Sequence, residues 1–190
     1  MKGGYAIQYI LMSPQELELV KQAKQGNKEA FGEIYKLYLD RIYRFVLYLV
    51  YDEPVAQDLT QETFIKAWNF LPKFKIGVGT LQSFLYTVAR NLVLDHQRKK
   101  PNLSLDNEAG EAIPDGTNIE EQILTVETEN SIALALKNLP EFDRQIVILR
   151  FFEDLPFKEV ARILKKDEGA LRVRLHRALQ TLKIYLRETK

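Results

Sequence analysis

Residues 159–182 read EVARILKKDEGALRVRLHRALQTL, and this stretch decides the fold of the C-terminal part of the chain. Apolar residues recur every three or four positions on both sides of Lys165–Asp167, which is the period of an amphipathic helix. We predict a short helix over 156–164, a three-residue turn, and a longer helix from Glu168 to about Arg187, the outline of a helix-turn-helix. The predicted inward stripe of the longer helix is Leu171, Leu175, Leu179, Leu182 and Leu186.

The longer helix separates apolar from basic side chains. Its basic residues outside the leucine stripe, with the lysine just before it, are Lys166, Arg172, Arg174 and Arg177. Asp167 can cap the helix, and Gly169 and Ala170 are small enough to let the backbone approach a phosphate or a base edge. Arginine can bond bidentately to guanine in the major groove, so the pattern favours DNA binding. It also suits a surface helix whose basic face is only solvated.

Most of the remaining chain has the same helical period. Between residues 27 and 50, the apolar side chains at steps of three or four are Phe31, Ile34, Tyr38, Ile42, Phe45 and Leu49. Further helices are predicted over 13–26, 52–71, 81–98, 119–138 and 141–152. No segment alternates with a period of two, so the predicted fold is all-α, with two small helical bundles.

Charge divides the chain into three blocks. Residues 1–100 carry 14 basic and 10 acidic side chains, and residues 128–190 carry 13 and 9. Residues 101–127 carry 7 acidic side chains and no Lys or Arg, with prolines and glycines among few apolar residues. We therefore expect two domains, 13–100 and 125–190, that face a polyanion, joined by an acidic flexible linker over 101–124.

Composition excludes several classes of protein. The chain has no cysteine, which excludes a disulfide scaffold, a thiol nucleophile and a Cys-ligated zinc site. The two histidines match no metal-ligand spacing, and no phosphate-binding glycine motif is present, so we expect no metal, no cofactor and no enzyme activity. The longest apolar run, Phe45–Tyr51, is too short to cross a bilayer, and the first residues make a poor signal peptide. We expect a cytoplasmic protein without membrane insertion.

Two sets of motifs resemble the sigma-70 family, specifically its extracytoplasmic-function (ECF) group. Residues 159–164 and 168–178 are similar to that group's fourth region in order and spacing. Residues 56–68 resemble the polymerase-binding segment of its second region, and residues 84–100 resemble the promoter-melting helix. Two independent motif sets in the correct order are more specific than either set alone.

The resemblance implies a dissociable, non-catalytic subunit that binds core RNA polymerase and promoter DNA. In such proteins the first domain holds the polymerase and opens the −10 element, and the last domain reads the −35 duplex. An anti-sigma factor is a further partner that the family suggests, although nothing in the sequence identifies one. Two alternatives stay open from the residues alone: a dimeric operator-binding regulator whose residues 15–100 sense a ligand, and a helical adaptor that binds no nucleic acid.

The expected polymerase-binding surface lies on the helix over 52–71. Its acidic and polar residues fall at steps of three, one and four, so they share one face, with aromatic side chains beside it that could anchor a partner protein. The expected residues are Asp58, Leu59, Gln61, Glu62, Phe64, Ile65, Lys66 and Trp68. The alternative is an ordinary amphipathic helix with a buried Trp68.

The expected −10 surface combines the loop over 73–83 with the helix over 81–98. Strand opening without ATP requires new contacts to the freed bases, and stacking on an aromatic ring contributes about 1–3 kcal/mol per base. The expected residues are Phe74, Tyr86, Arg90, Asn91, Asp95, Arg98, Lys99 and Lys100. Alternatively, Phe84 and Tyr86 belong to the core, and the basic cluster complements the helix C-terminus.

The residues expected to contact the −35 duplex are Lys166, Glu168, Gly169, Ala170, Arg172, Val173, Arg174 and Arg177. The sequence departs from the family pattern at the turn. Pro156 stands where a serine or threonine usually caps the first helix, and Lys165 stands where a glycine often ends it. A left-handed backbone would cost lysine about 1 kcal/mol, so the geometry of the turn is in question.

Overall fold

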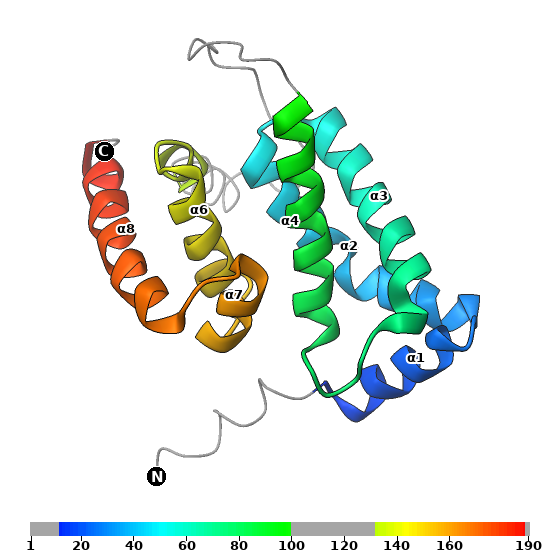
Figure 1. Ribbon diagram of the computed structural model, residues 1–190. Helices are drawn as coiled ribbons and strands as arrows, with labels where there is room; N and C mark the ends of the chain where they lie inside the picture. The colour runs from blue at the N-terminus through cyan, green and yellow to red at the C-terminus, as the bar shows by residue number, and fades with distance from the viewer. Residues whose placement is uncertain (1–11, 100–131, 189–190) are drawn as a thin grey trace, which may run out of the picture.

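We describe the fold from a computed structural model, in which residues 12–99 and 132–188 are described (Figure 1). Within these ranges the regular structure is helical, apart from one isolated bridge between Ile76 and Gly79. The expected linker over 101–124 lies outside the described residues. So does most of the helix expected over 119–138, whose described part is helical at residues 132–137.

The first unit consists of α1 (Pro14–Lys24), α2 (Lys28–Val50), α3 (Glu53–Phe70), a short 3₁₀ turn (Leu71–Lys73) and α4 (Leu81–Lys99). Side-chain caps fix three of the helix starts. The side chains of Ser13, Asn27 and Asp52 each accept a bond from the backbone N–H three residues later, at 3.1, 2.9 and 3.0 Å. The all-α prediction is confirmed.

The second unit consists of α6 (Glu141–Val147), a π-helix (Ile148–Phe152), α7 (Phe157–Leu164) and α8 (Glu168–Glu188). The single α-helix that we expected over 141–152 is therefore wrong in its second half. The backbone N–H of Glu153 donates to the carbonyl of Ile148, five residues earlier, at 3.1 Å. Wide turns of this kind often occur at functional sites, and this one ends at Glu153, next to the first unit.

The turn between α7 and α8 forms despite the missing glycine. Lys165 adopts the left-handed conformation, with φ 54° and ψ 48°. Its N–H donates to the carbonyl of Arg162 at 3.4 Å, and that of Lys166 donates to Ala161 at 3.0 Å, as in a Schellman motif. The backbone is thus strained at Lys165, but the chain still forms the turn that joins α7 to α8.

The two units share one hydrophobic core. Its largest fully buried side chains include Ile34, Ile42, Phe45 and Tyr86 from the first unit and Leu136, Ile146, Leu149 and Ile163 from the second. Helix α4 packs against α7, and α8 lies on the side of the second unit that faces away from α4 (Figure 1). Among the described residues, no helix is long and apolar enough to cross a membrane.

Candidate nucleic-acid and polymerase interfaces

The start of α8 is open to solvent. The Oδ1 atom of Asp167 accepts the N–H of Ala170 at 3.1 Å, which confirms the predicted cap. Lys166, Gly169 and Ala170 are exposed, and Glu168 is half-buried. The first turn therefore presents backbone and short side chains to whatever approaches the N-terminal end of this helix.

The remaining residues of the predicted −35 set stand on the same helix with their side chains exposed. The Arg172 guanidinium lies 4.1 Å from the ring centre of Phe157 and 3.6 Å from the Glu168 carboxylate, while 59% of its side chain stays exposed. Stacking on a ring of α7 orients this cation. Val173 and Arg177 are also exposed. We name the exposed residues Lys166, Gly169, Ala170, Arg172, Val173, Arg174 and Arg177 the α8 face.

Arg174 has an intramolecular partner that the sequence did not reveal. Its Nε atom donates to Asp143 on α6, and its guanidinium lies 4.9 Å from the ring centre of Phe142. About half of the Arg174 side chain remains exposed. Asp143 lies 31 residues away in the sequence, so spacing gave no signal for this pair.

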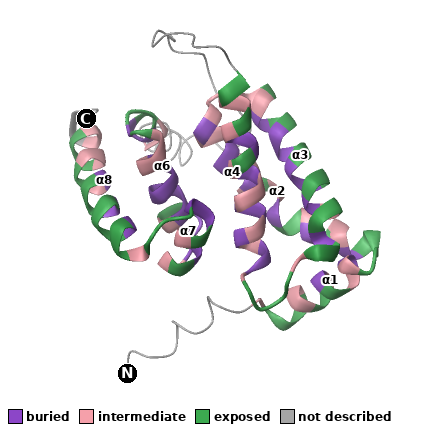
Figure 2. Cartoon of the chain, in the orientation of Figure 1, coloured by how far each residue is buried: buried purple, intermediate pink, exposed green. Residues whose placement is uncertain are grey.

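Helix α3 presents a continuous polar face around one apolar side chain. Asp58, Gln61, Glu62, Ile65 and Lys66 are exposed, and Figure 2 shows exposed residues along this helix. Lys66 pairs with Glu62 at 2.9 Å, one helical turn apart. Ile65 is 62% exposed. We name these five residues the α3 face.

The other residues of the predicted polymerase-binding set point elsewhere. Leu59 and Phe64 are buried in the core, where the Phe64 ring packs edge-on against Tyr35. Trp68 is half-buried, with its ring centre 5.0 Å from that of Phe31. Phe64 and Trp68 pack against rings of α2 and Leu59 is buried, so these three side chains are not part of the α3 face.

A cavity of about 440 Å³ lies between the loop after α3 and the first turns of α4. Its lining includes Phe70, Phe74, Val78, Phe84, Thr87 and Arg162. Lys24 on α1 donates to the Phe74 carbonyl and so ties the loop to the first unit. Phe74 and Phe84 pack with their ring centres 5.3 Å apart, which gives the cavity an aromatic wall. We name this the loop cavity.

The second half of α4 carries most of the polar −10 residues. Asn91, Asp95, Arg98 and Lys99 are exposed, and Arg98 approaches Asp95 at 3.5 Å. Lys100 lies outside the described residues. The exposed polar and basic groups thus gather on the last turns of the helix, and the loop cavity lies at its first turns.

Tyr86 is not a surface residue. Its ring has no exposed area and packs edge-on against Phe45, with ring centres 5.0 Å apart. Its hydroxyl donates to the carboxylate of Glu153. Burial raises the pKa of Tyr86, and Glu153 raises it further. The expectation that Tyr86 stacks on a base is not supported in this arrangement, and the alternative of a core residue describes it.

Arg90 also faces the second unit. Its Nε atom donates to the side-chain oxygen of Gln145 on α6 at 2.7 Å. Burial lowers the pKa of Arg90, although Glu141 opposes this shift. The predicted phosphate contact would have to replace this bond between the two units.

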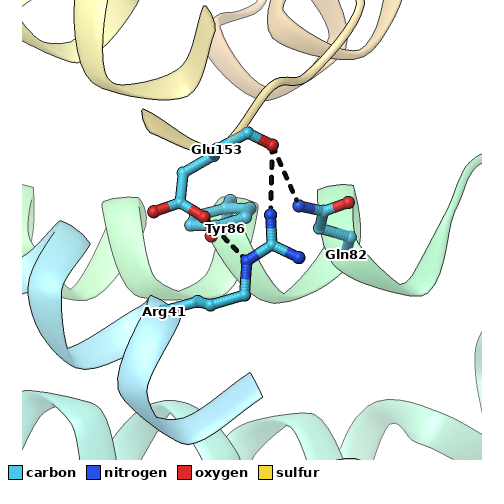
Figure 3. A network of polar contacts seen from close by, with 4 residues as sticks. All are labelled: Arg41, Gln82, Tyr86 and Glu153. Carbon is cyan, nitrogen blue, oxygen red and sulfur yellow. Dashed lines mark hydrogen bonds and ion pairs between the residues drawn. The ribbon is translucent and has the colours of Figure 1, made fainter. Parts of the chain in front are cut away.

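Glu153 is a functional candidate that sequence reasoning missed. It is 3% exposed, and its carboxylate accepts from Arg41 Nε on α2 at 3.0 Å as well as from Tyr86 (Figure 3). Its carbonyl accepts from Arg41 at 3.1 Å and from Gln82 at 3.4 Å. Burial lowers the pKa of Arg41, but the nearby Tyr86 and Glu153 outweigh that effect and raise it. Because the ion pair spans 112 residues, no local pattern predicts it.

Among residues 12–99 and 132–188, no group of three or more acidic, histidine or cysteine residues could hold a metal ion.

Residues 34–101 match the model of sigma-70 region 2, and residues 129–182 match that of sigma-70 region 4. The chain belongs to the sigma-70 family. Region 2 covers most of α2 and all of α3 and α4, and region 4 covers α6, α7 and most of α8. Sigma factors are regulatory subunits that direct RNA polymerase to promoters, so the family explains why this chain has two separate candidate interfaces.

Relatives place the chain in the ECF group. It is 30% identical over 179 residues to the ECF RNA polymerase sigma factor SigW of Bacillus subtilis, covering 89% of this chain and 95% of SigW. It is 34% identical over 174 residues to the ECF RNA polymerase sigma factor BldN of Streptomyces coelicolor. That match covers 90% of this chain and 65% of BldN.

A solved structure supports the arrangement of helices. The structure of CnrH in complex with the cytosolic domain of CnrY matches with a TM-score of 0.71 at 20% identity. The match covers 93% of this chain and 99% of the CnrH chain. It supports the fold of this sigma factor.

Proposed function

We propose that this ECF sigma factor binds core RNA polymerase through the α3 face and directs it to promoters by two separate DNA contacts. The α8 face reads the −35 duplex. The loop cavity and the last turns of α4 capture the −10 strand once it is opened. No part of this activity requires a bond to be made or broken by the chain itself.

The observation that carries the proposal is Ile65, which is 62% exposed at the centre of the α3 face. An apolar side chain ringed by Asp58, Gln61, Glu62 and Lys66 gains most when a partner protein covers it. Burial of an isoleucine side chain contributes about 1.5–3 kcal/mol, which suffices for an anchor. The surrounding charges add specificity more than affinity.

The DNA contacts are supported by charge and shape. Arg172 and Arg174 stand exposed on the N-terminal half of α8, the part of a recognition helix that enters the major groove. The loop cavity has an aromatic wall at Phe74 and Phe84, and a flipped base needs such a wall for stacking. Arg98 and Lys99 lie on the last turn of α4, where they can bind the phosphates of the same strand.

Family membership also favours this proposal over the two alternatives. Residues 34–101 match sigma-70 region 2, where an operator-binding regulator would need a domain that senses a ligand. Residues 129–182 match sigma-70 region 4, which supports a nucleic-acid contact that an adaptor would lack.

The test uses purified core RNA polymerase in a pull-down and in run-off transcription. Replacing Asp58 and Gln61 together by alanine should weaken capture of the polymerase and reduce run-off product. The matched control replaces Gln15 and Glu18 by alanine, which removes one exposed amide and one exposed carboxylate from α1. Equal capture by both double variants would remove the α3 face from the interface, and no transcription from any promoter by the unaltered chain would overturn the proposal.

A further inference from the structure

The ring of Phe157, the first residue of α7, contacts two arginines from other elements. The guanidinium of Arg172 on α8 lies 4.1 Å from the ring centre, and that of Arg150 on the π-helix lies 5.7 Å from it. A guanidinium within about 6 Å of the centre of an aromatic ring is attracted to the ring, and this electrostatic attraction weakens with distance. The ring therefore holds Arg172 more strongly than it holds Arg150.

The start of α7 fixes the ring in place. Pro156 is the N-cap of this helix, and its carbonyl accepts the N–H groups of Glu159 at 2.9 Å and of Val160 at 3.1 Å. Leu155, just before the cap, is buried, and Phe157 is half-buried against the hydrophobic core. A side chain that is packed in this way has little rotamer freedom left. Phe157 thus offers Arg172 a rigid surface.

Carboxylates hold the two arginines unequally. Arg150 pairs with Asp154 at 3.0 Å, whereas the Glu168 carboxylate lies 3.6 Å from Arg172. The side chains of Arg172 and Glu168 are 59% and 43% exposed. An exposed pair contributes little, because water and salt screen it. The orientation of Arg172 in the unbound protein therefore depends more on the Phe157 ring than on the Glu168 carboxylate.

Orientation matters because of the base contact that we propose for Arg172. An arginine reads guanine in the major groove through two hydrogen bonds at once, so its planar guanidinium must lie in a defined position. An arginine that is free to rotate loses rotamer entropy when it is fixed in such a contact, and pre-organisation in the unbound protein removes part of that cost. Contacts with phosphates demand less defined geometry, so the gain applies mainly to the matching base pair.

We infer that Phe157 is a positioning residue for −35 recognition: its ring pre-organises the Arg172 guanidinium for one base pair and so raises the discrimination of the α8 face at that base pair. This inference rests on the proposed function and adds a residue that acts through Arg172. Local sequence patterns do not reveal this pair, because Phe157 and Arg172 stand on different helices, on either side of the turn at Lys165.

The test measures discrimination by holoenzyme assembled from core RNA polymerase and each full-length variant. The probes are a promoter selected for strong run-off transcription from a library with a randomised −35 element, and templates in which each −35 base pair of that promoter is changed in turn. Discrimination is the ratio of transcription from the selected promoter to transcription from a changed template. Because both templates meet the same holoenzyme, this ratio does not depend on how much holoenzyme a variant forms. The base pair at which Arg172→Ala lowers the ratio most is assigned to Arg172.

Phe157→Leu should lower the ratio at the assigned base pair by about three- to tenfold and leave the ratios at the other base pairs nearly unchanged. Arg172→Ala should lower it more, by about 5- to 150-fold. Phe157→Leu added to Arg172→Ala should have no further effect on the ratio, because the ring acts through the arginine. Phe157→Tyr keeps an aromatic ring and should retain the discrimination of the unaltered chain.

Phe151→Leu is the matched control. Phe151 is 56% exposed, and its ring centre lies 5.9 Å from the guanidinium of Arg150. The variant thus removes a ring of the same unit that contacts Arg150 on the π-helix, and it should leave every ratio unchanged. Thermal melting measures the stability of each variant, so a general loss of packing in Phe157→Leu is detected separately from the loss of discrimination.

Two results would overturn the inference. One is an unchanged ratio for Phe157→Leu at the base pair that Arg172→Ala identifies. The other is a further loss when Phe157→Leu is added to Arg172→Ala, which would show that the ring acts on the fold or on DNA without the arginine. If Arg172→Ala itself leaves every ratio unchanged, the −35 contact of the proposed function fails, and the inference fails with it.

Discussion

Replacement of Arg174 by alanine separates DNA recognition from folding. Within the protein, Arg174 makes a half-exposed ion pair with Asp143 and a stacking contact with Phe142. An exposed ion pair contributes about 0.2–1 kcal/mol, and an exposed cation–π contact contributes about 0.5–1 kcal/mol. Arg174→Ala should therefore lower the free energy of unfolding by at most about 2 kcal/mol, which leaves most molecules folded because domains are stable by about 5–15 kcal/mol.

The effect on promoters should be larger and of a different kind. A lost base contact costs about 1–3 kcal/mol, which corresponds to a loss of about 5- to 150-fold in −35-dependent transcription. The assay is run-off transcription with core polymerase on templates with the intact and a scrambled −35 element. Arg174→Ala should reduce transcription from the template with the intact −35 element and leave transcription from the scrambled template nearly unchanged. Thermal melting measures the stability of the variant separately.

Asp143→Asn is the matched control. It weakens the ion pair while keeping the Arg174 side chain, so it should share the small loss of stability and retain transcription. If Arg174→Ala leaves −35-dependent transcription unchanged, or if Asp143→Asn is equally damaging, Arg174 acts by joining α6 to α8 and does not read DNA.

Three further predictions concern stability, pH dependence and polymerase binding. Lys165→Gly should raise the free energy of unfolding by about 1 kcal/mol, because glycine adopts the left-handed conformation without strain, and a denaturant titration that shows no gain would argue against strain at this turn. The raised pKa of Tyr86 means that the folded chain holds the hydroxyl proton more tightly than the unfolded chain does. The contribution of this group to the free energy of unfolding is therefore complete below pH 10 and falls as the pH rises above 10. Tyr86→Phe should reduce this loss of stability at high pH, as measured by thermal melting at a series of pH values. Ile65→Ala should weaken capture of core polymerase by about 1–3 kcal/mol with little change in melting temperature, because this side chain is exposed, and a large fall in melting temperature would show that it supports the fold instead.

The sequence predicted most accurately the features that depend on residues close together in the chain. Helix starts at Ser13, Asn27 and Asp52 depend on a side chain and a backbone group three residues apart, so they could be located from spacing. The apolar stripe of α2 followed from the helical period in the same way. The sequence predicts the position of the turn at Lys165 but not its backbone conformation. Hydrogen bonds of the helix cap hold this lysine in a left-handed conformation that the residue type disfavours.

The candidate site was predictable where exposure follows from helix periodicity. Asp58, Gln61 and Glu62 share a face because of their spacing, and the structure finds all three exposed. Helical periodicity alone did not distinguish the residues that form the exposed face from the residues of the same helix that are buried behind it. Phe64 lies in the core because it packs against Tyr35, a residue from another helix.

What the sequence determined alone was an all-α fold with a basic C-terminal helix and a polar face on α3, since helical period and capping act within a few residues. Only the tertiary structure decided which cations are already paired and how the two units meet. Arg174 with Asp143, Arg90 with Gln145, and Arg41 with Glu153 join residues 31, 55 and 112 positions apart. Such contacts are selected by the packing of whole helices and the need to pair a buried charge, and no local pattern encodes them.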